Sequence, residues 1–325
     1  MLFRAMRAAD VDGCVALIPG TTGIEATPRS SLSTLWRELL REERLNGGVV
    51  VDAPASDRVM AFGLTAFVDD AFMVDYLAAP RPWLTALLYG RVQSQRSLLL
   101  APRDVRTANA AGHLNLVVLH FCLGVDIGTP EGQAVVAAAE AGFRLAHVGH
   151  RVRRVLQEGY TPLDRMMLGS AGLRLKSDYA GQLDGLPEDR RPFLMGLFSE
   201  DAESRLLGTA AASLFQYNEP RFFFSLGEQR VLARAVLDDS DEEIARELGL
   251  SIAAVKKIWR RVYERVDDTD PDLSVANENK PGFTRGKEKR RNLIRYLRYH
   301  LEELRPTVRP PRPRADPRGR GEQVG

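Results

Sequence analysis

Residues 225–266 read SLGEQRVLARAVLDDSDEEIARELGLSIAAVKKIWRRVYERV. Two serine–glutamate pairs stand three residues apart: Ser225 with Glu228, and Ser240 with Glu243. Such capping boxes satisfy free N–H groups at the start of a helix, and Ser251 is a third candidate for this role. The pattern predicts three short helices. The second ends at Gly249, where a tight turn favours a residue that tolerates positive φ.

The third of these helices has two different sides. Its apolar residues recur at gaps of three and four, which predicts one buried stripe: Ile252, Val255, Trp259, Val262 and Val266. Between residues 252 and 266 five residues are basic and one is acidic, a net charge of +4, whereas residues 228–247 hold seven carboxylates. A basic face beside acidic helices indicates that the third helix meets phosphates or base edges.

The spacing of Ala245, Gly249 and Val255 matches the small residue, turn glycine and buried aliphatic residue of a helix-turn-helix. Over about 40 residues the chain resembles the LuxR-type DNA-binding domain, and sigma-factor region 4 is similar over the same stretch. Two positions depart from the LuxR-type pattern, since Ala254 stands where Thr is common and Ile258 where His is usual.

The LuxR-type resemblance implies that the third helix enters the major groove of DNA. The expected DNA-binding residues are Ser251, Lys256, Lys257, Arg260, Arg261 and Arg265. The expected helix-turn-helix core is Ile244, Ala245, Leu248, Gly249, Val255, Trp259 and Val262. By their chemistry, Arg260 and Arg261 suit bidentate recognition of guanine, and the two lysines suit phosphate. The alternative is a solvated basic face on an ordinary three-helix unit.

Outward from this segment, the chain divides into further parts. Residues 1–180 predict an α/β domain with a mixed sheet: helices over 31–45 and 131–141, the second ended by Gly142, and strands at 49–51, 58–67, 72–77 and 114–121. Residues 181–224 predict a linker with short helices. A helix-turn-helix domain over 225–270 precedes a basic amphipathic helix over 283–305, which extends a DNA footprint, aids dimerisation or only packs. The Arg/Pro tail at 306–325 is expected to be disordered.

The element order of the N-terminal part resembles the GNAT acetyltransferase fold: an opening element from Arg4 to Asp10, a helix, antiparallel strands, a strand and a closing helix. This resemblance implies that a glycine-containing loop at a helix N-terminus binds the pyrophosphate of acetyl-CoA. The usual Arg/Gln-x-x-Gly-x-Gly/Ala sequence is absent, and Gly124, Gly128 and Gly132 are an irregular substitute. A PAS- or GAF-like sensor remains compatible with the same pattern.

Composition excludes several functions. The chain has 325 residues and two cysteines, no apolar run approaches ~20 residues, and no secretory signal is visible. The first lysine is Lys176, which excludes a Walker A lysine, a Schiff-base lysine and a receiver domain before it.

The net charge of +2 conceals an uneven distribution of charge along the chain. Residues 280–325 carry 14 basic and 5 acidic residues, a net charge of +9, and the remainder carries −7. No histidine or cysteine spacing is typical of a metal site, and no catalytic residue or cofactor is assigned.

These patterns predict a bacterial, cytoplasmic transcriptional regulator that is not an enzyme. An N-terminal domain that senses an unknown small-molecule effector would control how the helix-turn-helix meets double-stranded DNA. We expect the protein to form a homodimer and to contact RNA polymerase, and we expect no interaction with a membrane. Two alternatives stay open: a GNAT-like N-acetyltransferase with an appended DNA-binding domain, and a sigma-region-4-like interaction module.

Overall fold

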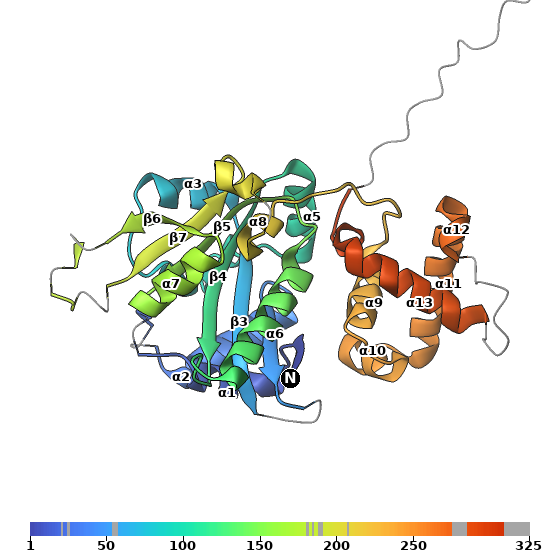
Figure 1. Cartoon of the computed structure of the whole chain (residues 1–325), viewed down its shortest axis with the longest axis horizontal. Helices are drawn as coiled ribbons and strands as arrows, with labels where there is room; N and C mark the ends of the chain where they lie inside the picture. Colours follow the sequence, from blue (N-terminus) through green and yellow to red (C-terminus); the bar gives the residue numbers. More distant parts are fainter. Residues whose placement is uncertain are drawn as a thin grey trace, which may run out of the picture.

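The computed structural model describes residues 1–20, 22–24, 27–53, 58–179, 182–183, 185–187, 191–206, 208–274 and 285–308. These residues form a sheet covered by helices, here called the sheet unit (residues 2–213), and a group of helices beside it, the helical unit (residues 226–304) (Figure 1). None of the helices in the described part is both long enough and apolar enough to cross a membrane.

The sheet has seven strands in the order β1-β2-β3-β4-β5-β7-β6. Their bounds are β1 Leu2–Ala5, β2 Asn46–Val51, β3 Val59–Val68, β4 Leu114–Leu123, β5 Val152–Gly159, β6 Arg174–Asp178 and β7 Phe193–Phe198. β4 and β5 run parallel, and the other neighbouring strands are antiparallel. β4 is buried on both faces, as its continuous apolar run predicts.

Helices cover both faces of the sheet. The bounds are η1 Ala8–Asp10, α1 Val11–Ala16, α2 Arg29–Arg41, α3 Asp70–Ala78, α4 Leu84–Val92, η2 Arg96–Leu98, α5 Pro102–Ala111, α6 Pro130–His147, α7 Pro162–Ser170, η5 Ala202–Arg205 and α8 Ala210–Ser213. The core on one face joins residues of α1 to α4 with inward residues such as Phe62 and Leu156. The core on the other face joins α5, α7 and α8 to Val155 and Leu116. The sheet unit is therefore the mixed α/β structure that the sequence predicts.

The sheet unit differs from the predicted elements in three places. Residues 72–77 belong to helix α3 instead of a strand, because Asp69 caps it by accepting from the Phe72 amide. Residues 181–224 contain β7, which pairs with both β5 and β6, so the sheet extends into the segment expected to be a linker. Periodicity alone does not distinguish the short apolar run of β7 from a short buried helical segment, and its pairing with β5 and β6 decides that it is a strand.

The third difference is that α6 continues past Gly142 to His147. A Cβ built at Gly142 would lie 2.2 Å from Cδ2 of Phe3, and one built at Gly48 would lie 2.4 Å from the same ring. Phe3 therefore fills the space that two missing side chains leave between β2 and α6. Gly142 serves this close approach and does not end the helix.

The helical unit begins where the capping patterns predict. Its elements are α9 Leu226–Val236, α10 Asp241–Leu248, α11 Ile252–Thr269, α12 Pro271–Ser274, α13 Arg285–Tyr299 and η6 Leu301–Leu304. Both capping boxes are present, and Gly249 has φ of +63°. Leu293 and Leu297 of α13 join the core of this unit. Residues 309–325 of the predicted tail lie outside the described residues.

The close approach at Phe3 gives a test of packing. Gly142→Ala should lower the free energy of unfolding by about 1–3 kcal/mol, because the added methyl overlaps the Phe3 ring. In a Phe3→Ala background the same change should be neutral, or stabilise by about 0.5–1 kcal/mol, since alanine is the better helix former. Urea unfolding of the four proteins measures the coupling. Equal effects of Gly142→Ala in both backgrounds would contradict this account.

Candidate functional site

The sheet opens between β4 and β5. Their pairing runs from Leu114 with Val152 to Val118 with Gln157 and stops there, although β4 continues to Leu123 and β5 to Gly159. On its other side β4 shifts register against β3 between Leu64 and Thr65, which leaves a bulge at Leu119. The two halves of the sheet therefore separate at one end. Beyond Val118 and Gln157, β4 and β5 form no backbone pairs with each other.

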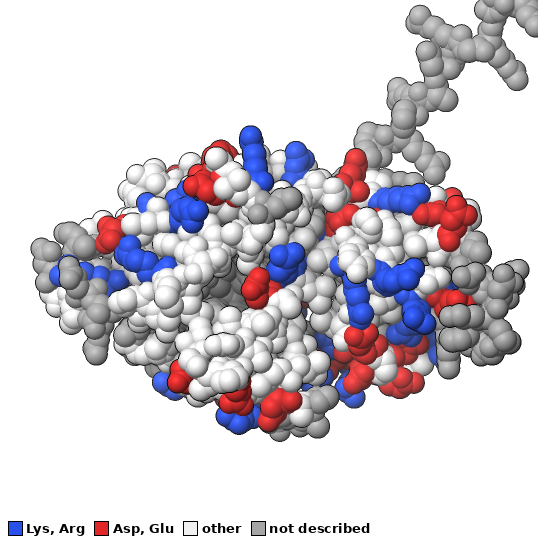
Figure 2. Space-filling model, in the orientation of Figure 1, with Lys and Arg blue, Asp and Glu red and all other residues white. Residues whose placement is uncertain are grey.

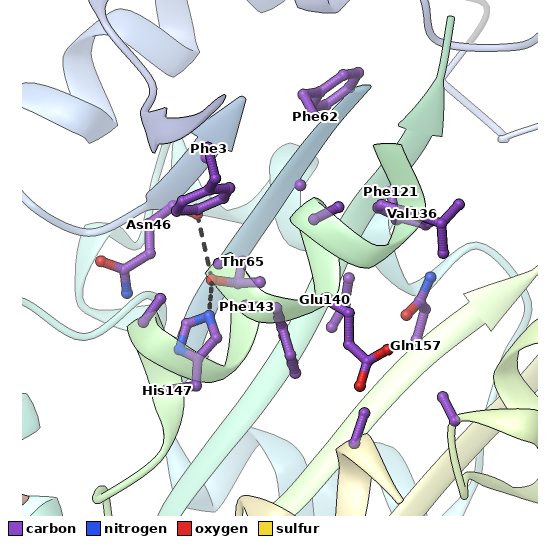
Figure 3. A pocket seen from close by; sticks show the side chains of 18 of the residues that line it. Phe3, Asn46, Phe62, Thr65, Phe121, Val136, Glu140, Phe143, His147 and Gln157 are labelled. Carbon is purple, nitrogen blue, oxygen red and sulfur yellow. Dashed lines mark hydrogen bonds between the residues drawn. The ribbon is translucent and has the colours of Figure 1, made fainter. Parts of the chain in front are cut away.

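A groove of about 1080 Å³ lies over this opening, between α6 and α7. Its lining is largely apolar and includes Val118, Phe121, Val136, Phe143, Leu163 and Met167. Figure 3 shows Val136, Glu140 and Phe143 on α6 and Gln157 nearby among the residues that line the groove. Uncharged side chains dominate the surface over α6 and α7 (Figure 2). This volume is slightly larger than the roughly 300–1000 Å³ typical of small-molecule sites.

Glu158 stands on β5 just after the pairing with β4 ends. Its Oε2 accepts from the Tyr160 hydroxyl at 3.1 Å and from the Thr85 amide at 3.4 Å, in the first turn of α4. Its Oε1 is buried without a partner among the described residues. Burial raises the pKa of Glu158 to about 7, although hydrogen bonding from the backbone of Leu84 and Thr85 and from the Tyr160 hydroxyl opposes the rise. The group can therefore take up or release a proton near neutral pH.

The start of α4 is held over Glu158 by two further contacts. The Thr85 hydroxyl donates to the carbonyl of Leu119, the bulged residue of β4, at 3.2 Å. Trp83 stacks on Tyr160 with ring centroids 6.0 Å apart, and its φ of +70° is a left-handed conformation that a bulky residue rarely adopts. α4 belongs to the segment between β3 and β4, so this segment covers the opening on the face away from the groove.

The loop before α6 does not fit a diphosphate. The Gly128 amide donates to the Asp126 carboxylate at 2.9 Å, and the Gly132 amide donates to Thr129 at 3.1 Å. Pro130 has no N–H, and Glu131 adds a second negative charge in the first turn. A helix N-terminus binds anions through free amides and a positive dipole, and this one is occupied by its own side chains. No step below is derived from coenzyme A.

The residues expected to meet DNA lie on α11, but they do not share one environment. Lys256, Lys257, Arg260 and Arg261 are exposed, and none of them makes an ion pair with a described residue. Arg265 instead lies 3.4 Å from the buried carboxylate of Glu228. Ser251 caps α11 by accepting from the Ala254 amide. Four of the six side chains are thus free for a partner.

The expected helix-turn-helix core lies in the interior of the helical unit. Ile244, Ala245, Val255, Trp259 and Val262 are buried, and Leu248 is partly buried. Several basic residues of α13 are engaged within the unit: Lys289 with Asp267, Arg290 with Asp241, and Arg298 with Asp238. Arg290 also lies over the Trp259 ring. These contacts favour packing as the role of α13.

No cluster of three metal-ligating side chains occurs among the described residues. His120 is buried in an aromatic group with Trp36, Phe62 and Tyr89. His147 and His150 are buried near the end of α6, and burial lowers the pKa of His147 to about 3.

Comparison with known proteins gives similarity of fold. No family model and no curated protein matches the chain, so the LuxR-type assignment of residues 225–270 stays a prediction. Similar solved structures include a polyamine N-acetyltransferase from Drosophila melanogaster, with 14% identity, 61% of this chain and 99% of that chain covered, and a TM-score of 0.35. An N-acyl amino acid synthase from uncultured soil microbes shares 9% identity over 61% and 95%, with a TM-score of 0.33.

A third similar structure is a GNAT-like decarboxylase solved with isobutyryl-CoA, at 14% identity over 61% and 99% and a TM-score of 0.32. These three proteins are an acetyltransferase, a synthase and a decarboxylase, so the similarities speak against the expectation that the chain is not an enzyme. The GNAT-like element order of the sheet unit agrees with the resemblance noted in its sequence.

Sequence reasoning missed Glu158 and Tyr160. The strand sequence, VRRVLQEG, is half polar, so the local pattern gives no signal that the Glu158 carboxylate is buried. The adjacent aspartates Asp69 and Asp70 serve structural roles, since Asp69 caps α3 and Asp70 pairs with Arg153 and Arg154. Glu158 lies at the opening because β5 pairs with β4 and β7. The sequence does not indicate which strands β5 pairs with.

The raised pKa of Glu158 predicts a pH dependence of stability. Its folded-state pKa of about 7 exceeds the ordinary 4.5, so its contribution is complete below pH 4.5 and is lost as pH rises through 7. The loss should reach roughly 3 kcal/mol in the free energy of unfolding. Urea unfolding at several pH values should show a shallower decline for Glu158→Gln, whereas the exposed control Glu131→Gln should follow the wild type. Parallel curves for wild type and Glu158→Gln would refute the assignment.

Proposed function

We propose that the sheet unit transfers an acyl group to an amine or similar nucleophile, and that the helical unit binds DNA. The observation that carries the first part is the opening between β4 and β5: the apolar groove lies on one face of it, and the buried carboxyl group of Glu158, with a pKa of about 7, lies on the other. An extended acyl chain fits the apolar walls between α6 and α7. The edge of β4 beyond Val118 offers backbone groups with no partner from β5.

Proton transfer follows from the hydrogen bonds at Glu158. The acceptor's nitrogen bonds to the acyl carbon, and its proton passes to the Glu158 carboxylate as the bond from that carbon to the leaving group breaks. Glu158, oriented by the Tyr160 hydroxyl that donates to Oε2 at 3.1 Å, then gives this proton to the leaving group. The acyl donor is an activated compound such as a thioester. The acidic loop before α6 favours a donor without a diphosphate at that position.

Acyl transfer is tested with two thioesters of the same acyl group, hexanoyl-N-acetylcysteamine and hexanoyl-CoA, against a panel of primary amines. Release of free thiol should be faster with the first donor than with the second. Glu158→Gln should lower kcat by roughly 10²–10⁴-fold, and Tyr160→Phe should lower it less. The surface control Glu131→Gln should keep wild-type activity. Full activity in Glu158→Gln would refute its role, and no thiol release with any amine would refute acyl transfer.

DNA binding rests on a separate observation, the four exposed basic side chains of α11 that lack ion-pair partners in the described chain. Arg260 and Arg261 suit guanine, and Lys256 and Lys257 suit phosphate. The short turn at Gly249 sets α10 against α11, as the LuxR-type resemblance implies for a helix that enters the major groove. A homodimer would present two such helices to two half-sites.

Selection of genomic fragments by the purified protein, followed by titration at several salt concentrations, tests DNA binding. Replacing Arg260 and Arg261 by Ala should weaken binding at least tenfold and reduce its salt dependence. Replacing Arg103 and Arg106 by Ala removes the same charge from an exposed position on α5 of the sheet unit. This control should change the affinity for DNA little. Equal loss in both double variants would indicate only general attraction to phosphate and contradict the role of α11.

A further inference from the structure

The groove does not end at the opening of the sheet. Its lining continues around the end of α6 to Ala233 and Arg234 of α9, to Leu237 just after α9, and to Leu304 and Arg305. The walls of this arm therefore come from both the sheet unit and the helical unit. The two units also meet directly, since Arg7 lies 3.1 Å from Glu247 and Arg230 pairs with Glu43.

Arg305 is an unusual wall residue because its charge is buried. Only 7% of it is exposed, and its guanidinium donates to the carbonyls of Val148 and Leu145 at the end of α6. No Asp or Glu of the described chain lies within ion-pair distance of it. Glu302 contributes only at longer range, and its carboxylate is bonded to His300 at 3.0 Å. A buried cation is costly unless an anion accompanies it.

His147 places a second polar group on the same wall. The Thr65 hydroxyl donates to the carbonyl of Asn46, so the contact of 3.1 Å between Thr65 and Nε2 uses the ring N–H as donor. Nδ1 is then an acceptor, and it is buried without a partner among the described residues. Figure 3 shows the ring with one nitrogen on Thr65 and the other turned away. Only 2% of His147 is exposed.

We propose that the arm of the groove between α6 and α9 binds a small amphiphilic carboxylate with a hydroxyl or amide N–H close to the carboxyl group. Arg305 pairs with the carboxylate, for which a planar guanidinium is the matching donor. The neutral ring of His147 accepts from the hydroxyl or N–H. Ala146, Leu237 and Leu304 leave room for an aliphatic tail.

Such a ligand acts on the helical unit because its site is shared. α9 leads directly into α10 and α11, and its residues form the wall opposite α6. A bound ligand stabilises the conformation in which α6 and α9 both line the arm. The population shift is set by how much more tightly the ligand binds this conformation than one in which the two walls are apart. The site thus couples a metabolite-sized carboxylate to the position of α11. This inference does not depend on acyl transfer at Glu158.

The experiment uses the full chain and three probes: 3-hydroxydecanoate, decanoate and 1,3-decanediol. Isothermal titration should give affinities that fall in that order, because the second lacks the hydroxyl and the third lacks the charge. Arg305→Gln should weaken binding of both acids at least tenfold and leave the diol unchanged. His147→Phe should bring the affinities of the two acids together. Arg103→Gln, which removes an exposed arginine from α5, should match the wild type.

Arg305 also holds the end of α6, so its loss could unfold the chain. Ala233→Phe avoids this, since it fills the arm from α9 and leaves the contacts of Arg305 intact; it should abolish binding of both acids with the circular dichroism spectrum unchanged. Equal binding of hydroxydecanoate and the diol, unchanged binding in Ala233→Phe, or no binding of either acid to the wild type overturns the proposal.

Discussion

The parallel pairing of β4 with β5 is the constraint on which the rest of the sheet unit depends. Parallel strands need a long crossover, and here α6 supplies it across one face of the sheet. Beyond Val118 and Gln157 each strand keeps only its other neighbour among the described strands, β3 for β4 and β7 for β5. The separation produces the groove on one face, and on the other it produces a gap that α4 covers.

The gap is costly to maintain, and the contacts around it explain how it persists. Glu158 is buried with one oxygen unpartnered, which disfavours its ionised form. The first turn of α4 and the Tyr160 hydroxyl offset part of this cost, and Thr85 fastens α4 to the bulge of β4. Trp83 adopts a left-handed conformation to complete the cover. A strained residue and a carboxylate with a raised pKa at one opening are typical of functional sites.

The contact between the two units has a different chemistry. Arg305 reaches from the end of the helical unit to the last carbonyls of α6, which carry the negative end of the helix dipole. The Asn109 amide donates to the carbonyl of Pro306 at 2.8 Å, and Gln229 of α9 donates to the carbonyl of Arg305 at 2.6 Å. Residues 301–306 therefore link α5 and α6 to α9. A ligand beside Arg305 would act on this link.

The sequence alone determined the local structure of the helical unit, because capping, helical periodicity and the turn at Gly249 depend on residues within one turn of each other. It also determined the buried strand at 114–121 and the general α/β character of the N-terminal part. The end of α6, the helix at 70–78 and the strand at 193–198 were decided by tertiary contacts: the Phe3 ring on Gly142, the Asp69 cap, and the pairing of β7 between β5 and β6. The groove, the pKa of Glu158 and the burial of Arg305 were decided there too. Each depends on residues far apart in the chain, and no local pattern encodes how such residues meet.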